Sequence, residues 1–296
     1  MELRHLRYFV AVAEAMNFTR AAARLRVAQP ALSRQVQDLE DEIGVDLLKR
    51  SPRGVTLTAE GRLYLEEARE ILKRSEEAVE KVRALARGEY GELQVGYAPA
   101  PSSSFLPQAL TAFHKAAPGV QVTLHDLTED DMVARLVEGT LELAITVEHP
   151  EQSSPGIEFE ELLRVPFLVA MSPGHALAKK KALKLEEIAA QPLIGFHRRD
   201  YPEYHRLLGR MFPKMKQGPR LIQECDGSIS LLTALEAGRA IAVVSAQFRH
   251  VAGKRLVFKP IADCNESHAV GIARAMKGDV TPAGEKFCEI LRAVAR

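Results

Sequence analysis

The stretch FTRAAARLRVAQPALSRQVQDLEDE, from Phe18 to Glu42, predicts two helices with a short break between them. In the first helix, Ala21, Ala22 and Leu25 share one face, and their small size lets a second helix cross close by. In the second helix, apolar side chains recur at spacings of four, three and four residues, which is one stripe of an amphipathic helix: Leu32, Val36, Leu39 and Ile43. The stripe predicts that one side of this helix is buried.

The other face of the second helix is polar and carries Gln29, Ser33, Arg34 and Gln37, while Pro30 suits its first turn. Such a face fits the DNA major groove, where Gln pairs with adenine and Arg with guanine or phosphate. The alternative is the solvated face of any small helical domain. Four arginines without an intervening acid favour the nucleic-acid interpretation: Arg20, Arg24, Arg26 and Arg34.

The segments around this pair complete a small domain. Residues 3–16 form a helix that packs under the pair, and two short extended pieces, 45–50 and 55–58, flank a Pro/Gly turn that indicates a hairpin. A hairpin after a helix-turn-helix is a wing. Its basic residues could reach phosphates or the minor groove, although a solvated basic loop is the alternative: Lys49, Arg50 and Arg53.

One long helical pattern without proline runs over residues 59–87. Apolar or small residues repeat at three-four spacing, as in a coiled coil, while charges of both signs flank them: Leu65, Ala68, Leu72, Ser75, Val79, Val82 and Ala86. We expect this helix to pair with a second copy rather than to lie in an intramolecular bundle. A dimer would present two recognition helices to a two-fold DNA site.

From Glu92 the pattern changes to short strands alternating with helices. The predicted strands are 92–98, 120–124, 141–147, 157–164, 165–171, 192–196, 219–224, 240–244, 255–260 and 268–274, and the predicted helices are 103–117, 129–138, 185–190, 201–212, 227–238, 246–250 and 282–295. This alternation implies parallel sheets covered on both faces. The length of the region favours two α/β lobes with a cleft between them.

Composition narrows the class of protein. A chain of 296 residues with 46% hydrophobic residues suits two or three packed domains, and its net charge of +1 makes any nucleic-acid contact local. The three cysteines form no CxxC or Cys/His cluster, which argues against structural zinc and suits a reducing compartment. No apolar run approaches ~18 residues, and the first helix contains Glu14 and no cleavage-like tail. We therefore expect a cytoplasmic protein without a membrane segment.

The sequence resembles the LysR-type transcriptional regulators along its whole length, most specifically over Leu3–Gly61. The distinctive runs are AQPALSRQ at 28–35, Leu39-Glu40, and LTAEG at 57–61. Weaker matches are Gly96, Leu106-Pro107, Pro118-Gly119-Val120, LELAI at 141–145, and Glu236-Ala237-Gly238 with IAVV at 241–244. Many family members have Ser at position 28, where it would cap the recognition helix by about 1 kcal/mol; Ala28 lacks that cap.

The resemblance implies an α/β protein overall. It predicts a winged helix-turn-helix over 1–58, a linker and dimerisation helix over 59–88, and a two-lobed effector domain over 89–296 that resembles periplasmic binding proteins. Lobe one would comprise about 90–163 plus 268–296, and lobe two about 164–267. Implied partners are a double-stranded DNA operator, RNA polymerase and further copies in a dimer or homotetramer, with no cofactor. The DNA-binding candidates are Thr19, Gln29, Pro30, Ser33, Arg34, Gln37, Arg50 and Arg53.

The resemblance also implies a small-molecule effector bound between the lobes. The candidates by position are Ala100, Pro101, Ser102, Ser103, Ser104, Thr128, Glu129, Thr146, Phe196, His197, Ser228 and Ile229. The serines at a helix start and the His197-Arg198-Arg199 loop favour a carboxylate-bearing ligand; simple capping and solvated cations are the alternatives. The recognition helix and wing most resemble the subgroup that controls aromatic-compound degradation, but Ala100 and Glu129 replace hydroxyl residues there.

Three other functions are weaker interpretations. An enzyme would need a site motif, yet the chain contains no GxSxG, phosphate loop or paired metal motif. A redox-sensing regulator of the same fold would use Cys225 and Cys264, which lie 39 positions apart on or beside predicted strands and are better explained as buried structural thiols. A solute-binding protein without DNA function would not need residues 1–88.

Overall fold

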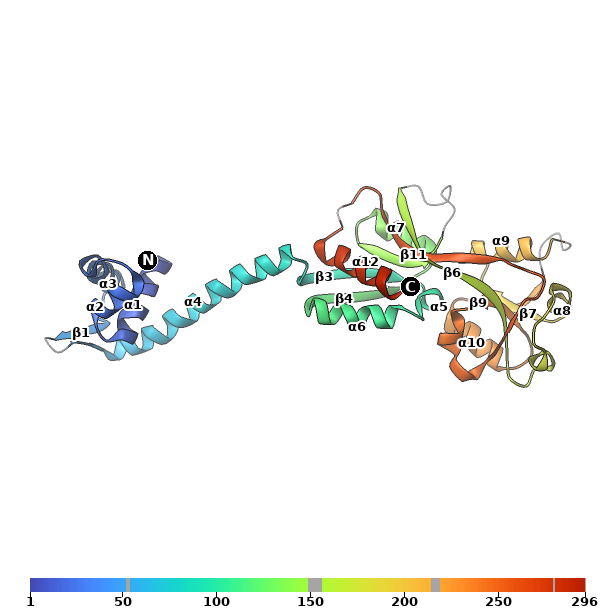
Figure 1. Ribbon diagram of the computed structural model, residues 1–296, viewed down its shortest axis with the longest axis horizontal. Coiled ribbons are helices and arrows are strands. Elements are labelled where there is room, and N and C mark those ends of the chain that lie inside the picture. The colour runs from blue at the N-terminus through green and yellow to red at the C-terminus, as the bar shows by residue number, and fades with distance from the viewer. Residues whose placement is uncertain (52–53, 149–155, 214–218, 279, 296) are drawn as a thin grey trace. The chain divides into compact units, whose positions relative to one another are not determined.

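The computed structural model describes residues 1–51, 54–148, 156–213, 219–278 and 280–295 (Figure 1). The chain forms two compact units, Met1–Ala84 and Leu85–Arg296. No helix in the described part of the chain is both long and apolar enough to cross a membrane.

The first unit is built on three helices, α1 (Leu3–Ala15), α2 (Phe18–Leu25) and α3 (Gln29–Ile43). Their shared core contains three of the four stripe residues predicted for α3, the fully buried Leu32, Val36 and Leu39, whereas Ile43 in the last turn is 36% exposed. The α2–α3 turn begins at Arg26, which adopts a left-handed conformation (φ 57°) and donates its N–H to the carbonyls of Ala22 and Ala23. As predicted, Ala28 gives α3 no side-chain cap.

A hairpin follows α3. Strands β1 (Leu48–Ser51) and β2 (Gly54–Leu57) pair antiparallel, with Leu48 opposite Leu57. The turn residues Pro52 and Arg53 lie outside the described residues. The first strand begins three residues later than predicted because the backbone N–H groups of Leu47 and Leu48 both donate to the Glu40 carboxylate, each at 2.9 Å, rather than to a neighbouring strand.

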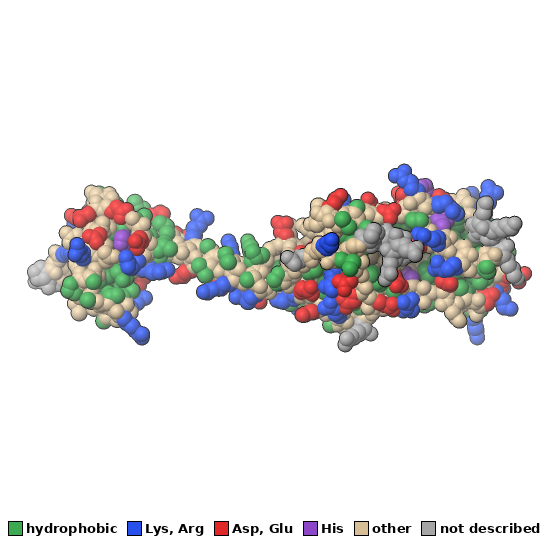
Figure 2. Space-filling view, turned by 90° about the horizontal axis from the view of Figure 1, so that it is seen from above, with side chains coloured by type: hydrophobic (Ala, Val, Ile, Leu, Met, Phe, Trp, Pro, Cys, Tyr) green, Lys and Arg blue, Asp and Glu red, His purple; other side chains and the backbone are tan. Residues whose placement is uncertain are grey.

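Helix α4 (Ala59–Ala86) uses its apolar seam in two ways. Its first half packs on the core of the first unit through Tyr64, Leu65, Ala68 and Leu72. In its second half apolar side chains are exposed, with 47% of Val79 and 69% of Val82 accessible, and Figure 2 shows such side chains at the surface along the helix. The expectation of one continuous seam for a partner is therefore wrong for the first half, which an intramolecular core covers.

The second unit contains a seven-stranded sheet in the order β10-β6-β11-β5-β3-β4, with β9 also paired to β6. The strands are β3 (Tyr90–Tyr97), β4 (Gly119–Asp126), β5 (Leu143–Val147), β6 (Ile157–Met171), β9 (Ala242–Ser245), β10 (Val257–Pro260) and β11 (Ser267–Ala275). Within the described part of this sheet, β3 pairs parallel with β4 and β5, whereas β9, β10 and β11 run antiparallel to β6. The prediction of wholly parallel sheets is thus wrong: 157–164 and 165–171 are one strand without a crossover helix.

Helices cover both faces of the part of the sheet that contains β3, β4 and β5. On one face lie α6 (Leu106–Ala116) and α12 (Pro282–Val294), where the rings of Phe113 and Phe287 meet edge to face with centroids 5.0 Å apart. On the other face, Met132 and Leu136 of α7 (Glu129–Val137) pack on Ala144 and Ala273. We call the apolar side chains packed on both faces of this part of the sheet the first core.

A second core surrounds the other half of β6 and a two-stranded parallel sheet of β7 (Leu193–Phe196) and β8 (Leu221–Cys225). Its helices are α8 (Leu185–Ala189), α9 (Pro202–Met211), α10 (Ser228–Glu236) and α11 (Phe248–Ala252). The helix predicted over 103–117 is α6, which begins at Leu106, and a short helix that was not predicted, α5 (Pro99–Ser102), precedes it; Ala100 of α5 packs in the second core.

The β6–β11 pair depends on Gly271, next to which the register shifts. A Cβ at Gly271 would lie 1.9 Å from the carbonyl oxygen of Glu160. We expect Gly271→Ala to lower the free energy of unfolding by about 3 kcal/mol, the upper end of overpacking effects. Urea denaturation followed by circular dichroism measures this.

Gly209→Ala on α9 is the matched control, because nothing lies within 4 Å of its Cβ, and removing a helical glycine stabilises by about 0.5–1 kcal/mol. Equal urea midpoints for Gly271→Ala and Gly209→Ala would contradict the close approach of β6 to β11 at Gly271.

Candidate nucleic-acid interface and ligand cavity

The polar face of α3 is accessible. Gln29, Pro30, Arg34 and Gln37 are exposed and Ser33 is half-buried. Thr19 is exposed on the first turn of α2. Within the described residues Arg34 forms no ion pair, so its guanidinium is available to a phosphate or a guanine edge. The structure thus brings most of the predicted DNA-binding side chains onto one surface.

Arg50 is held against α3 rather than extended from the hairpin. Its Nη2 lies 3.1 Å from Oε2 of Glu40, its Nη1 lies 3.3 Å from Oγ of Ser33, and its guanidinium sits 5.2 Å from the centre of the Phe18 ring. The buried Glu40 carboxylate therefore joins α3 to the first strand of the hairpin. Sequence reasoning missed Glu40, although an acid four residues after Val36 on the buried stripe is a signal that could have found it.

Part of the predicted basic cluster is already paired. Glu14 accepts hydrogen bonds from Arg69 and Arg24, both at 3.0 Å, and the Arg69 contact chiefly lowers the pKa of Glu14. Arg20 donates to the carbonyl of Ala15. Arg53, the remaining predicted contact of the wing, lies outside the described residues. Arg34 thus has fewer competing acids nearby than Arg24.

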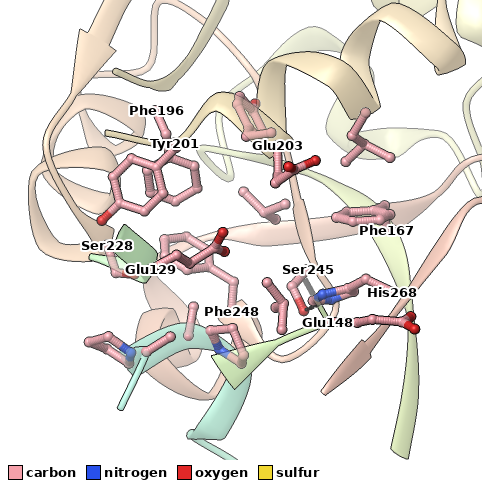
Figure 3. Close-up of a pocket in the computed structure, with 18 of the residues that line it drawn as sticks. Glu129, Glu148, Phe167, Phe196, Tyr201, Glu203, Ser228, Ser245, Phe248 and His268 are labelled. Carbon is pink, nitrogen blue, oxygen red and sulfur yellow. Dashed lines mark hydrogen bonds between the residues drawn. The ribbon is translucent and has the colours of Figure 1, made fainter. Parts of the chain in front are cut away.

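The second unit contains a cavity of about 200 Å³ between the two cores (Figure 3). Five of the predicted effector positions line it: Ala100, Pro101, Glu129, Phe196 and Ser228. Much of the remaining wall comes from residues that sequence reasoning missed, among them Glu148, Phe167, Tyr201, Glu203, Phe248 and His268. They lie on five different elements or the loops beside them, and no pattern within one element indicates that they meet.

The predicted serines do not present hydroxyl protons to this cavity. Oγ of Ser102 donates to the Ala98 carbonyl at 2.7 Å, and Oγ of Ser103 lies 2.8 Å from the Ala100 carbonyl and 2.9 Å from that of Gln247. Ser102, Ser103 and Ser104 are not among the lining residues. Neither the anion-binding prediction nor the N-capping alternative describes Ser102 and Ser103, since both donate to carbonyls and the N-cap residues of α5 and α6 are Ala98 and Phe105.

The other predicted positions also lie elsewhere. Thr128 caps α7, with its Oγ1 2.8 Å from Oδ2 of Asp131. Thr146 is buried beside a neighbouring cavity, and its Oγ1 has no hydrogen-bond partner among the described residues. His197 faces Asp200 and Glu224 at 3.2 and 3.8 Å, and Ile229 is 67% exposed. None of these four lines the cavity between the cores.

Burial perturbs the titratable groups of the cavity. It raises the pKa of Glu129 to about 7, assisted by the charge of Asp130 and opposed by Arg206. Burial also raises the pKa of Tyr201 to about 12, with further contributions from the carboxylates around it: Asp126, Glu129, Asp200 and Asp226. Carboxylates therefore surround the Tyr201 hydroxyl at this end of the cavity.

His268 is a neutral wall residue. Its ring stacks on Phe167 with centroids 4.8 Å apart, and its Nε2 lies 2.9 Å from Oγ of Ser245. Burial lowers the pKa of His268 to about 4, and Arg164 acts in the same direction. His268 lies opposite Val165, near the point where β6 leaves its pairing with β11 and continues into the second core.

The described residues contain no group of three or more His, Cys, Asp or Glu side chains that could hold a metal ion. Cys225 and Cys288 are buried, and burial raises the pKa of both thiols, that of Cys288 to about 11. These two cysteines are protonated at neutral pH and unsuited to rapid oxidation.

Both units match known families. Residues 3–62 match the bacterial regulatory helix-turn-helix proteins of the lysR family, and residues 86–296 match the LysR substrate binding domain. TcbR of Pseudomonas sp. (strain P51) is 35% identical over 261 residues, which cover 88% of each chain. The Hca operon transcriptional activator HcaR of Escherichia coli K12 is 34% identical, with 99% of this chain and 97% of HcaR covered.

A similarity of structure accompanies that of sequence. The crystal structure of full-length CbnR in complex with its target DNA aligns over 100% of both chains, with a TM-score of 0.84 and 33% identity. An exposed polar recognition helix and a cavity between two cores occur here in the matched regions. The chain belongs to the LysR family of DNA-binding transcriptional regulators, with a helix-turn-helix domain and an effector-binding domain on one polypeptide.

Proposed function

We propose that a small molecule bound in the cavity between the two cores switches how this regulator engages its operator. The observation that supports this most directly is the cavity itself, whose walls come from both cores: Glu129 belongs to α7 of the first, and Phe196 and Ser228 belong to the second. A ligand that contacts both sides stabilises one relative arrangement of the cores, and a difference in affinity between arrangements shifts their populations.

At the DNA, we assign base-edge contacts to Gln29, Ser33, Arg34 and Gln37 because they share the accessible face of α3. Thr19, Pro30, Arg50 and Arg53 contact the sugar-phosphate backbone. Glu40 does not touch DNA but positions Arg50 against α3 through their 3.1 Å ion pair. The relative CbnR, solved with its target DNA, supports this assignment by analogy.

The second half of α4 pairs with another copy, since about half or more of each of its apolar residues Val79, Val82 and Leu85 is accessible: 47%, 69% and 55%. Pairing brings two recognition helices together for a two-fold operator, and dimers associate further into tetramers. The regulator acts in the cytoplasm, contacts RNA polymerase and catalyses no reaction. Of the two cysteines that a redox switch would use, Cys225 is buried with a raised thiol pKa, which favours this ligand switch.

Blocking the cavity should abolish the response to effector. Ser228→Trp places a large side chain in the cavity, whereas Ile229→Trp, one residue on and 67% exposed, is the matched control. A thermal-shift screen of carboxylic acids, aromatics, amines and amino acids identifies stabilising compounds. We expect those compounds to stabilise the wild type and Ile229→Trp but not Ser228→Trp. Retained stabilisation of folded Ser228→Trp would show that the effector binds elsewhere.

Arg34→Ala should weaken specific DNA binding by about 1–3 kcal/mol, the usual cost of a lost bidentate base contact. Arg4→Ala removes the same charge from an exposed α1 residue that pairs with Glu2, and should cost far less. Fluorescence anisotropy on a duplex selected by the wild-type protein from a random pool measures both. Equal losses for the two variants would mean that Arg34 contributes only net charge.

Glu129 should make stability depend on pH. Its folded pKa of about 7 lies above the ordinary value of 4.5, so the folded state binds the proton more tightly. The contribution of Glu129 to the free energy of unfolding therefore falls as pH rises from about 4.5 to about 7. Urea denaturation of the wild type and Glu129→Gln at pH 5 and pH 8 tests this. The free energy of unfolding of Glu129→Gln relative to that of the wild type should be higher at pH 8 than at pH 5.

His268 acts in the opposite direction below its ordinary pKa of 6.5, but it is common to both proteins and cancels in the difference. Glu138→Gln, an exposed position at the end of the same helix, is the charge-matched control. A constant difference between wild type and Glu129→Gln at both pH values would contradict the buried environment of Glu129.

A further inference from the structure

The cavity between the cores is acidic. Three glutamates line it, Glu129, Glu148 and Glu203, together with Arg210 and His268. The charge of Arg210 is opposed by Glu266, whose Oε2 lies 3.3 Å from its Nη2, and His268 is neutral. Outside the lining, Arg206 pairs with Glu203 and Arg164 lies 4.0 Å from Glu148, but within the lining itself three carboxylates face one arginine.

The acidic groups lie beside aromatic rings. The Phe196 and Tyr201 rings are 4.7 Å apart, and the Tyr204 ring meets Phe196 edge to face at 5.2 Å. Figure 3 shows the carboxylate of Glu129 directed into the space next to the Phe196 and Tyr201 rings, whereas that of Glu203 points away from these rings. A carboxylate combined with aromatic faces is the arrangement that attracts an ammonium group, through Coulomb attraction and cation–π contact.

The groups that could attract an anion do not offset the carboxylates of the cavity. The hydroxyls of Ser102 and Ser103 are directed to backbone carbonyls, and His197 lies outside the cavity beside Asp200 and Glu224. The N-terminus of α10 reaches the cavity at Ser228, but the carboxylate of Asp226 precedes it and accepts a hydrogen bond from Ser230. A carboxylate ligand would meet like charges on several sides.

We infer that the effector is a small molecule with a protonated amine attached to an aromatic or apolar body. The amine lies between Glu129 and the Phe196 and Tyr201 rings, and the apolar body extends toward Phe167 and Phe248. Glu129 is the group that distinguishes charged from neutral ligands, since it faces both the rings and the open space. This inference rests on the proposed use of the cavity as the effector site.

Three matched probes test the ligand class on the full-length protein. Phenethylamine, phenethyl alcohol and hydrocinnamate share a phenyl ring and a short chain but carry a cation, a neutral group and an anion. Isothermal titration at pH 8, where Glu129 is ionised, should give the amine at least tenfold tighter binding than the alcohol, with hydrocinnamate weakest. Glu129→Gln should weaken amine binding about tenfold and leave alcohol binding within about twofold, and Glu138→Gln should change neither.

The outcomes separate the ligand class from the location of the site. Tighter binding of hydrocinnamate than of the amine, or no binding of the amine, overturns the ligand class. If Ser228→Trp also abolishes binding of whichever probe binds, the cavity remains the effector site. Unchanged amine binding by Ser228→Trp overturns both the cavity as the site and the inference drawn from it.

Discussion

The antiparallel pairing of β6 with β11 is the constraint on which the ligand-binding unit depends. Pairing runs from Ser267 opposite Pro166 to Ala275 opposite Ile157, which holds β11 to the first core, while β6 continues beyond the pair into the second core. Val165 and Ile272 pack in the first core, whereas Val169 and Met171, further along β6, pack in the second. The cores are therefore joined by one continuous strand, β6, whose first part is held by β11.

A buried charge has the corresponding role in the DNA-binding unit. Glu40 is 7% exposed, yet its two oxygens accept from the Leu47 and Leu48 backbone and from Arg50, so the carboxylate is compensated. An apolar residue would leave those donors without a partner. The ion pair fixes the hairpin relative to α3, which is the condition for both to meet one duplex in register. Buried pairs of this kind fix geometry more reliably than they add stability.

The sequence allowed prediction of what depends on periodicity within one element. The stripe of α3 appears fully buried at Leu32, Val36 and Leu39, and the 28-residue helix α4 lies within the range predicted for it. The sequence did not predict what packs against the apolar face of each helix. Leu65, Ala68 and Leu72 had the spacing of an intermolecular seam but cover the domain core, because spacing defines a face and not what packs against it.

The cavity shows the same limit more strongly. Phe167 and His268 stack across a strand pair, although about a hundred residues separate them in the chain, and nothing in either local pattern predicts the contact. Ser102 and Ser103 had the residue type and position of an anion site, but carbonyls within four residues accept their protons. Local hydrogen bonds to the backbone compete with ligand binding for hydroxyl groups, and only the folded geometry decides between them.

The charge of the cavity is set by residues at the ends of elements, not in the cores. Glu129 is the first residue of α7, and Glu148 follows β5 directly. An acid at a helix N-terminus interacts favourably with the helix dipole, which offsets part of the cost of burying Glu129. Replacing such a residue leaves the packing of Met132 and Leu136 on the sheet intact. A scaffold shared at about one-third identity with TcbR and HcaR can therefore carry a cavity of different polarity, because ligand charge and core packing are specified by separate side chains.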